Sequence, residues 1–379
     1  MTAPALGRLL VFNLAVDPAD PALGFAVDVL GRLAGRCQAV DVVTMRAEPA
    51  ALPANVTVYS VGKERGFSEA RRVARFYAVL TRLLRANDYD ACFAHMMPLF
   101  LAMGGPLLSR RRVPAVLWYA HRHVGPVLRV ACRWADEVVT SVPAAFGLSP
   151  RNTPVTHIGQ AIDVDLFSPG SASASASASA SASASASTPA GCRLLHVGRL
   201  SPVKQLDAAV RAVAVLRSQG MDASLRLVGS APAGHAQYEA ELRALVVALG
   251  LDDAVSFAGN LAHGDLAPEY RSAFAHVNLA PHGAVDKAAL EAMACGRPSI
   301  VANPSFAPVL GEWADALLLP EPSAERLAAA VQAVVAMPVA DQERMGAGLR
   351  AAVVAGHSVE HHVDEVVAAL ERVRDRARR

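Results

Sequence analysis

One acidic side chain stands out in the stretch HGAVDKAALEAMACGRP, which runs from His282 to Pro298. Glu291 lies within a short Ala/Leu/Met helix pattern whose other residues favour burial. Asp286 is a good N-cap for this helix, and Gly296 followed by a proline ends it. A carboxylate one turn inside such a helix can accept two hydroxyl hydrogen bonds, as from a ribose, which would compensate its desolvation. The N-terminus of the same helix, with its free N–H groups, suits a phosphate.

A second stretch whose residues could bind a ligand is HVGRLSPVK, from His196 to Lys204. It follows a strand-like run. Gly198 permits a tight turn and a close approach of the backbone to a ligand. Arg199 and Lys204 place two cations at the mouth of the same predicted sheet, and two cations suit a diphosphate.

Both stretches need a sheet that brings them to one edge, and the chain predicts such a sheet. Apolar strand-like runs alternate with helical patterns in each half, which indicates α/β units with parallel strands. The first half has such runs at 9–12, 40–44, 56–60, 91–94, 115–119, 137–140 and 155–158. The second half has strand-like runs at 193–197, 224–228, 254–257, 276–279, 299–302 and 316–319, and helical spacing at 203–219, 237–250, 286–295 and 323–336.

One predicted helix in the first half has an arginine-rich surface. Its apolar stripe consists of Val73, Phe76, Tyr77, Leu80, Leu83 and Leu84, with Arg71, Arg72, Arg75, Arg82 and Arg85 elsewhere on the helix. Such a helix is either plainly solvated or in contact with an anionic membrane surface, to which the Arg110–Arg112 run would add.

Composition limits the classes of protein that fit. A chain of 379 residues predicts two domains, and a formal net charge of +2 gives no overall attraction to nucleic acid. The sequence predicts no transmembrane helix and its start does not resemble a signal peptide, so we expect a cytoplasmic protein. Five widely spaced cysteines without a CxxC pair favour free buried thiols over disulfides or structural zinc.

The chain contains a segment of strict Ser/Ala alternation that has no large side chain to build a core. This segment, SPGSASASASASASASASASTPAG, predicts a flexible interdomain linker over 168–191. It would join an N-terminal domain over 1–165 to a C-terminal domain over 192–355. The last segment, 358–379, predicts a helix with a basic end.

Five blocks of the sequence together resemble the retaining glycosyltransferases of family 4. They are GQAIDVDLFSP (Gly159–Pro169), HVGRLSPVK, LRLVGSAP, VSFAGNL and DKAALEAMACGRP. The resemblance implies the GT-B fold, in which two Rossmann-like, doubly wound parallel-sheet domains face a cleft. The C-terminal domain would hold a nucleotide sugar and the N-terminal domain the acceptor, with the C-terminal helix crossing back to the N-terminal domain.

The resemblance also implies roles for residues of the second half. Arg199 and Lys204 would bind the donor diphosphate beside Gly198, and Glu291 would bind the ribose hydroxyls. Backbone amides near Ala284 to Lys287 would cap the distal phosphate. These groups would replace a metal, so neither a metal nor another cofactor is expected.

In the first half, the loop DPADPALGF would place Gly24 against the donor phosphates or the reacting sugar. His121 matches the family histidine beside the transferred sugar, and His95 matches a position near the acceptor. His123 is interpreted as structural.

One position departs from the family pattern. The family usually has two glutamates separated by seven residues, but Gly283 stands eight positions before Glu291. Asp286, beside Lys287, is either a replacement for the missing carboxylate or only the helix N-cap. The departure leaves open which group contacts the transferred sugar.

These features predict a glycosyltransferase that moves a sugar, with retention, from a nucleoside diphosphate sugar to a saccharide or lipid-linked saccharide. Bacterial surface polysaccharide or glycolipid assembly would be its setting. Two alternatives are a nucleotide-sugar epimerase of GT-B fold and a non-catalytic nucleotide-sugar-binding subunit. A nicotinamide dehydrogenase is disfavoured because no GxGxxG follows the first predicted strand.

Overall fold

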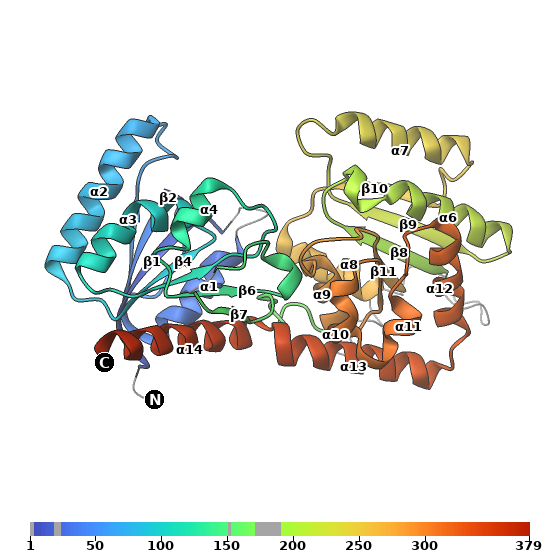
Figure 1. The fold of residues 1–379 in the computed structure, drawn as a ribbon. Coiled ribbons are helices and arrows are strands. Elements are labelled where there is room, and N and C mark those ends of the chain that lie inside the picture. Colours follow the sequence, from blue (N-terminus) through green and yellow to red (C-terminus); the bar gives the residue numbers. More distant parts are fainter. Residues whose placement is uncertain (1–3, 19–23, 151–152, 171–190) are drawn as a thin grey trace. The chain divides into compact units, whose positions relative to one another are not determined.

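The chain forms two compact units, which we describe separately (Figure 1). The structure is a computed structural model that describes residues 4–18, 24–150, 153–170 and 191–379. Unit 1 comprises residues 1–161 and 359–379, and unit 2 comprises residues 162–358. The C-terminal helix α14 (Val359–Arg378) therefore belongs to unit 1, although the rest of that unit lies at the other end of the sequence.

Unit 1 is built on a seven-stranded parallel sheet with the order β3-β2-β1-β4-β5-β6-β7. Its strands are rich in Val, Ala and Leu because helices cover both faces of the sheet. They are β1 (Leu6–Val16), β2 (Cys37–Ala47), β3 (Val56–Ser60), β4 (Ala91–His95), β5 (Ala115–Trp118), β6 (Glu137–Thr140) and β7 (Val155–His157).

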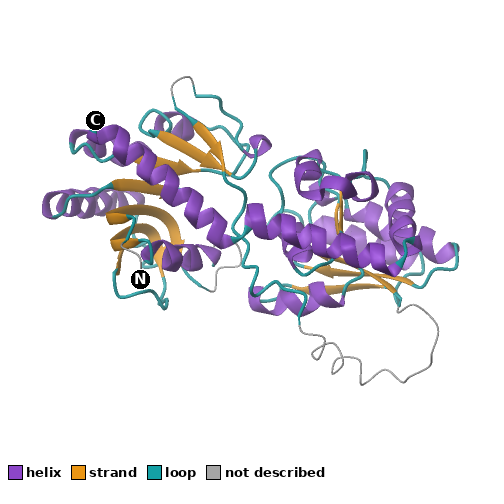
Figure 2. Ribbon diagram, turned by 90° about the horizontal axis from the view of Figure 1, so that it is seen from below, coloured by secondary structure: helices purple, strands orange, loops and turns teal. Residues whose placement is uncertain are grey.

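Two hydrophobic clusters fill the faces of this sheet. On one face α1 (Phe25–Ala34) and α14 pack against the strands, and Figure 2 shows α14 lying across them. On the other face lie α2 (Glu69–Ala86), α3 (Pro98–Arg110) and α4 (Pro126–Ala131). The doubly wound arrangement follows from strands that are apolar on both faces.

Unit 2 contains a five-stranded parallel sheet with the order β10-β9-β8-β11-β12. The strands are β8 (Cys192–Val197), β9 (Ala223–Val228), β10 (Val255–Gly259), β11 (Ala275–Asn278) and β12 (Ser299–Val301). The longer helices are α6 (Leu206–Ser218), α7 (Ala236–Ala248), α8 (Leu266–Ser272), α9 (Lys287–Ala294), α12 (Ala324–Ala336) and α13 (Val339–His357).

The strand order of unit 2 reverses between β8 and β11. From β8 the chain proceeds outward through β9 and β10, and it then returns to add β11 on the other side of β8. Loops that leave two such neighbouring strands in opposite directions open a crevice at their carboxyl ends, where ligands bind in open α/β sheets. In unit 1 the same reversal lies between β1 and β4.

One predicted strand is wrong. The run 316–319 falls on the short helix α11 (Ala314–Leu317), and only one isolated bridge joins Leu318 to Val301 of β12. A short apolar run does not by itself distinguish a buried helical turn from a strand. The predicted stripe of α2 also needs correction, because Val73 and Tyr77 are 43% and 39% exposed while Phe76, Val79 and Leu80 are buried.

The boundary between the two units precedes the Ser/Ala segment in the sequence. Described residues on both sides of it, up to Gly170 and from Gly191, belong to unit 2, and the boundary follows Ala161. The physical reason lies in Phe167, which is fully buried and packs against Tyr270 with ring centroids 5.7 Å apart. Residues 171–190 themselves lie outside the described part of the chain.

A close backbone contact at the β8–β9 edge gives a stability prediction. A Cβ atom on Gly229, whose φ is +131°, would lie 1.9 Å from the carbonyl oxygen of Gly198. We expect Gly229→Ala to lower the free energy of unfolding by roughly 2–4 kcal/mol, because the backbone itself must move. Urea unfolding checks this value.

Gly259→Ala is the matched control, because Gly259 also has a positive φ, +68°, but open space around its Cβ position. It should cost only the left-handed backbone conformation, roughly 1–2 kcal/mol. Equal losses in the two variants would contradict the predicted clash.

Candidate functional site

The loop after β8 lies against β9 through backbone hydrogen bonds. Gly198 has a φ of +145°, and its N–H donates to the carbonyl of Val228 at 2.9 Å. Leu200 donates to Ser230 at 3.0 Å in the same manner. Arg199, which lies between them, is exposed, and no ion pair or hydrogen bond of its side chain occurs within the described ranges.

An ion pair connects this loop to the N-terminus of α9. The Lys204 ammonium donates to Oδ2 of Asp286, which is 82 residues further along the chain. The Nδ2 atom of Asn278, the last residue of β11, donates to the same oxygen at 2.8 Å. The other oxygen of Asp286 accepts the N–H of Ala288 at 3.2 Å and so caps α9. One carboxylate thus joins the β8 loop, β11 and α9.

The electrostatics of Asp286 follow from these partners. Burial alone would raise the pKa of Asp286, but the Lys204 ammonium and the Asn278 amide hold it well below its ordinary value. The side chain is therefore a carboxylate at neutral pH, with its oxygens already engaged. Asp286 therefore acts as the N-cap of α9 and as the ion-pair partner of Lys204.

The loop between β11 and α9 is held by Asn303. Its Nδ2 atom donates to the carbonyl oxygens of Gly283 at 3.1 Å and Ala284 at 3.3 Å. Because Asn303 is buried, these hydrogen bonds hold the loop between β11 and α9 from its buried side. Gly283 has a φ of +120°, and a Cβ atom built there would meet no atom within 4 Å. The position where the family usually has its first glutamate therefore faces open space.

Glu291 is the buried carboxylate of the site, with 5% of its surface exposed. Its Oε2 atom accepts the hydroxyl of Tyr270 at 2.8 Å. Burial raises the pKa of Glu291 to about 7, against the opposing effects of the Tyr270 hydroxyl and the Lys287 ammonium. Burial lowers the pKa of Lys287 to about 7, and its ammonium nitrogen is shielded from solvent. A ligand that binds near α9 would therefore change the protonation of Glu291 and Lys287.

Two histidines lie directly beneath the site. His196 of β8 and His276 of β11 are fully buried, and their rings stack with centroids 6.2 Å apart. His196 shares a hydrogen bond of 3.0 Å between Nδ1 and the carbonyl of Val277. Burial lowers the pKa of His196 to about 4 and that of His276 to about 3, so both rings are neutral at physiological pH. The two rings are thus neutral polar groups buried below the site, one from each strand.

The candidate residues of unit 1 lie at the carboxyl ends of its strands. His95 ends β4 and is buried, with Nδ1 3.3 Å from Oδ1 of Asn13 in β1. His121 follows β5, is exposed, and accepts the N–H of His123 on its Nδ1 atom at 3.0 Å. Gly24 precedes α1 with a φ of −55°, so it needs no left-handed backbone there.

Within unit 2, the structure brings together most of the residues selected from the sequence. Lys204 contacts Asp286, and Lys287 and Glu291 follow on the same helix, whereas Arg199 makes no described contact with them. Sequence reasoning missed Asn278, Tyr270, Asn303, His196 and His276. For Asn278 and His276 the available signal was their position in the strand that leads into the loop before α9.

Comparison with known proteins covers the second half of the chain most strongly. Residues 191–337 match the family described as glycosyl transferases group 1. The D-inositol 3-phosphate glycosyltransferase of Acidothermus cellulolyticus is 41% identical over 117 residues, which is 30% of this chain and 26% of that protein.

Two further relatives match larger parts of the chain. The D-inositol 3-phosphate glycosyltransferase of Kribbella flavida is 26% identical over 396 residues, or 90% of each chain. The GDP-mannose-dependent alpha-(1-6)-phosphatidylinositol dimannoside mannosyltransferase of Mycobacterium tuberculosis is 32% identical over 41% of this chain and 39% of its own length.

Solved structures agree on the architecture. HepE of Anabaena, in complex with UDP, matches 96% of this chain and 100% of its own, with a TM-score of 0.73 and 19% identity. Sucrose-phosphate synthase of Thermosynechococcus elongatus matches 97% of this chain and 99% of its own, also with a TM-score of 0.73, at 20% identity. With its two parallel-sheet α/β units, the chain has the GT-B fold.

The two roles of Asp286 can be separated by a pair of substitutions. We expect Asp286→Asn to keep the cap on α9 and lose the ion pair with Lys204, whereas Asp286→Ala loses both. The alanine variant should then be less stable than the asparagine variant by about 1 kcal/mol. Equal stabilities in urea unfolding at pH 7 would contradict the capping role.

The ion pair adds a pH dependence with a defined sign. Because the folded pKa of Asp286 is depressed, its stabilising effect is present above the ordinary value of 3.8 and declines as pH falls below it. The stability difference between the wild type and Asp286→Asn should therefore narrow between pH 5 and pH 3. A difference that stays constant over this range would show that the pair contributes nothing.

Proposed function

We propose that the protein is a glycosyltransferase that transfers a sugar from a nucleoside diphosphate sugar to a hydroxyl group of an acceptor. The observation that carries this proposal is the set of groups at the β8–β11 switch point. The Lys204 ammonium adjoins the N-terminus of α9, the exposed Arg199 lies in the same loop after β8 as Lys204, and the buried Glu291 lies one turn inside α9. The group 1 match over 191–337 covers the same segment.

The donor would be bound by these residues in three parts. The Arg199 guanidinium would contact the diphosphate. It makes no described ion pair or hydrogen bond that this contact would have to break. The Lys204 ammonium retains two protons beyond the one donated to Asp286, so it can bind phosphate while it remains tied to α9. Glu291 would accept the ribose hydroxyls, since a buried carboxylate favours partners that compensate its desolvation.

The transfer would proceed with retention on one face of the sugar. The bond between the anomeric carbon and the phosphate oxygen breaks, the acceptor oxygen bonds to the same face, and the acceptor proton passes to the departing phosphate. Arg199, Lys204 and the N-terminus of α9 would stabilise the charge that develops on that phosphate. These cationic and dipolar groups would take the place of a metal. In unit 1, His121, His95 and Gly24 remain the residues selected from the sequence for contacts with the sugar, the acceptor and the donor phosphates.

Saccharide or lipid-linked saccharide acceptors are supported by the names of relatives. Relatives with 41% and 32% identity over parts of the chain are named for D-inositol 3-phosphate and phosphatidylinositol dimannoside. A polyol acceptor, free or lipid-linked, fits both. We place the reaction in bacterial surface polysaccharide or glycolipid synthesis.

A non-catalytic nucleotide-sugar-binding subunit is the second candidate, and one observation favours it. The family's usual sugar-contacting carboxylate is absent at Gly283, and Asp286 is already bound to Lys204, Asn278 and the helix backbone. Such a subunit would bind nucleotide and transfer nothing, and an epimerase would change the sugar without releasing it. Transfer from a labelled donor identifies the glycosyltransferase, and the configuration of the recovered nucleotide sugar separates the epimerase from the binding subunit.

We further propose that unit 1 contacts an anionic membrane surface through its α2–α4 face. This face carries apolar side chains that are 39–43% exposed, at Val73 and Tyr77 on α2, Leu99 on α3, and Val127 and Val130 on α4. No helix of the described ranges is long and apolar enough to cross a bilayer. Partly exposed apolar side chains on adjacent helices, with cations beside them, are typical of interfacial binding.

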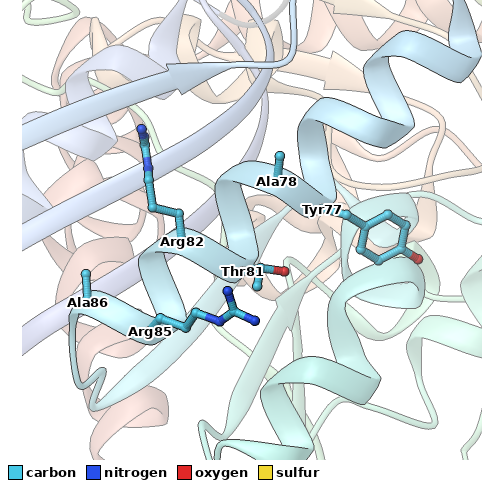
Figure 3. Close-up of a pocket in the computed structure, with 6 residues that line it drawn as sticks. All are labelled: Tyr77, Ala78, Thr81, Arg82, Arg85 and Ala86. Carbon is cyan, nitrogen blue, oxygen red and sulfur yellow. The ribbon is translucent and has the colours of Figure 1, made fainter.

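The cations of this face adjoin an open groove. The groove has a volume of about 680 Å³ and is lined by one side of α2 from Tyr77 to Ala86, including Arg82 and Arg85 (Figure 3). The Tyr77 hydroxyl donates to the carbonyl of Met103 in α3, so the ring bridges the two helices. Charge complementarity favours anionic lipid headgroups as the occupant of this groove.

A nucleotide panel tests the donor site. Thermal unfolding with UDP, GDP and ADP and their glucose or mannose conjugates, in EDTA, should show stabilisation by one base. Ligand at 100 times its Kd contributes about 2.7 kcal/mol. Arg199→Ala should weaken that binding roughly 10- to 150-fold, because a charge-assisted hydrogen bond is lost. Arg217→Ala, which removes a partly exposed guanidinium paired with Asp253, is the control. If no nucleotide stabilises the wild type, the donor site is refuted.

Vesicle flotation tests the membrane contact. We expect the protein to float with phosphatidylcholine vesicles that contain phosphatidylglycerol, and less with phosphatidylcholine alone. Arg82→Ala with Arg85→Ala should weaken binding roughly 30-fold, since each basic residue near the surface contributes about 1 kcal/mol. Arg211→Ala with Arg326→Ala removes the same charge from exposed positions of unit 2 and should change nothing. Equal losses in both double variants would contradict a specific α2 surface.

A further inference from the structure

One contact of the site has no role in the proposed function so far, namely the hydrogen bond from the hydroxyl of Tyr270 on α8 to Glu291. Tyr270 is fully buried and donates its hydroxyl proton to Oε2 of Glu291 at 2.8 Å. No other hydrogen bond to that carboxylate occurs in the part of the chain that the structure describes. One oxygen of Glu291 is thus held by the protein, and the other retains its lone pairs for a ligand.

The surroundings of Tyr270 fix its ring. Phe167 and His276 pack edge-to-face against it, with centroids at 5.7 Å and 6.0 Å. Burial and the neighbouring Glu291 carboxylate raise the pKa of Tyr270 well above its ordinary value, so its hydroxyl remains a donor. The ring cannot swing away without displacing these neighbours, which makes the hydrogen bond a fixed feature of the site.

We infer that Tyr270 is a positioning residue for recognition of the donor ribose, acting through Glu291. This inference rests on the proposed function, in which Glu291 accepts the ribose hydroxyls. Tyr270 holds one carboxylate oxygen so that the remaining lone pairs face the ligand in a single orientation. It touches no ligand itself.

The hydroxyl also controls the charge of Glu291. A hydrogen bond to the carboxylate form favours ionisation, and burial opposes it. Without the Tyr270 hydroxyl, a larger share of Glu291 would be protonated at neutral pH. A protonated carboxyl group donates one hydrogen bond and cannot accept from two hydroxyls in the same way. Loss of Tyr270 should therefore affect the ribose and leave the diphosphate contacts intact.

Discrimination between ribose and dideoxyribose measures this effect. The probes are UDP, GDP and ADP against their 2′,3′-dideoxy counterparts, with Kd values from calorimetry at pH 7.5. For the wild type we expect the nucleotide that binds best to lose affinity when both hydroxyls are removed. In Tyr270→Phe that ratio of Kd values should fall about tenfold, while affinity for the dideoxy compound changes less than twofold.

Tyr89→Phe is the matched control. Tyr89 is also buried and donates its hydroxyl to a carboxylate, Asp41, at 2.7 Å, but it belongs to unit 1. This control should leave the ratio unchanged. A Tyr270→Phe variant that folds and keeps the full wild-type ratio would overturn the inference and leave the proposed function standing. A wild type that binds nucleotides but ignores the ribose hydroxyls would also overturn it. A wild type that binds no nucleotide would overturn both.

A double variant keeps the test decisive if Tyr270→Phe fails to fold because the buried carboxylate is left without its donor. Tyr270→Phe with Glu291→Gln removes that charge. Because Tyr270 acts through Glu291, the double variant and Glu291→Gln should show the same ratio. A further drop in the double variant would show that Tyr270 contacts the ribose independently, against the inference.

Discussion

The organisation of the candidate site depends on the Asp286 carboxylate, which binds three segments at once. It accepts from Lys204 in the β8 loop, from Asn278 at the end of β11 and from the first turn of α9. These segments meet because β8 and β11 are neighbours at the point where the strand order reverses. The parallel sheet supplies the location, and the carboxylate fixes the relative positions of a cation and a helix N-terminus. The proposed phosphate site rests on that geometry.

The second layer of the site consists of buried polar groups. The Tyr270 hydroxyl, the Glu291 carboxylate and the neutral rings of His196 and His276 lie between the sheet and α9, where unpaired charge is costly. Their pKa values move in the directions that reduce buried charge, with Glu291 raised and both histidines lowered. A ligand that supplies hydroxyl donors to Glu291 would replace the water that this carboxylate has lost.

The fold class was predictable from the sequence, and so were the residues in motifs. Alternating strand and helix patterns located every observed strand, because parallel strands covered on both faces are continuously apolar. The positions of Lys204 in the loop after β8, of Asp286 at the N-cap of α9 and of Glu291 within α9 followed from turn and capping signals in the sequence. Tyr270 and Asn303 were not predictable, since their roles arise from tertiary packing between segments more than ten residues apart. The exposure of Val73 and Tyr77 was missed because helical spacing does not show how much of a helix its neighbours cover.

The most direct test is a crystal structure of the protein with the nucleoside diphosphate that stabilises it best. We expect the diphosphate to lie between the side chains of Arg199 and Lys204, at the N-terminus of α9. We also expect both ribose hydroxyls within hydrogen-bond distance of Glu291, with the Tyr270 bond to the same carboxylate retained. A nucleotide bound away from the β8–β11 switch point, or with its ribose turned away from Glu291, would contradict the account.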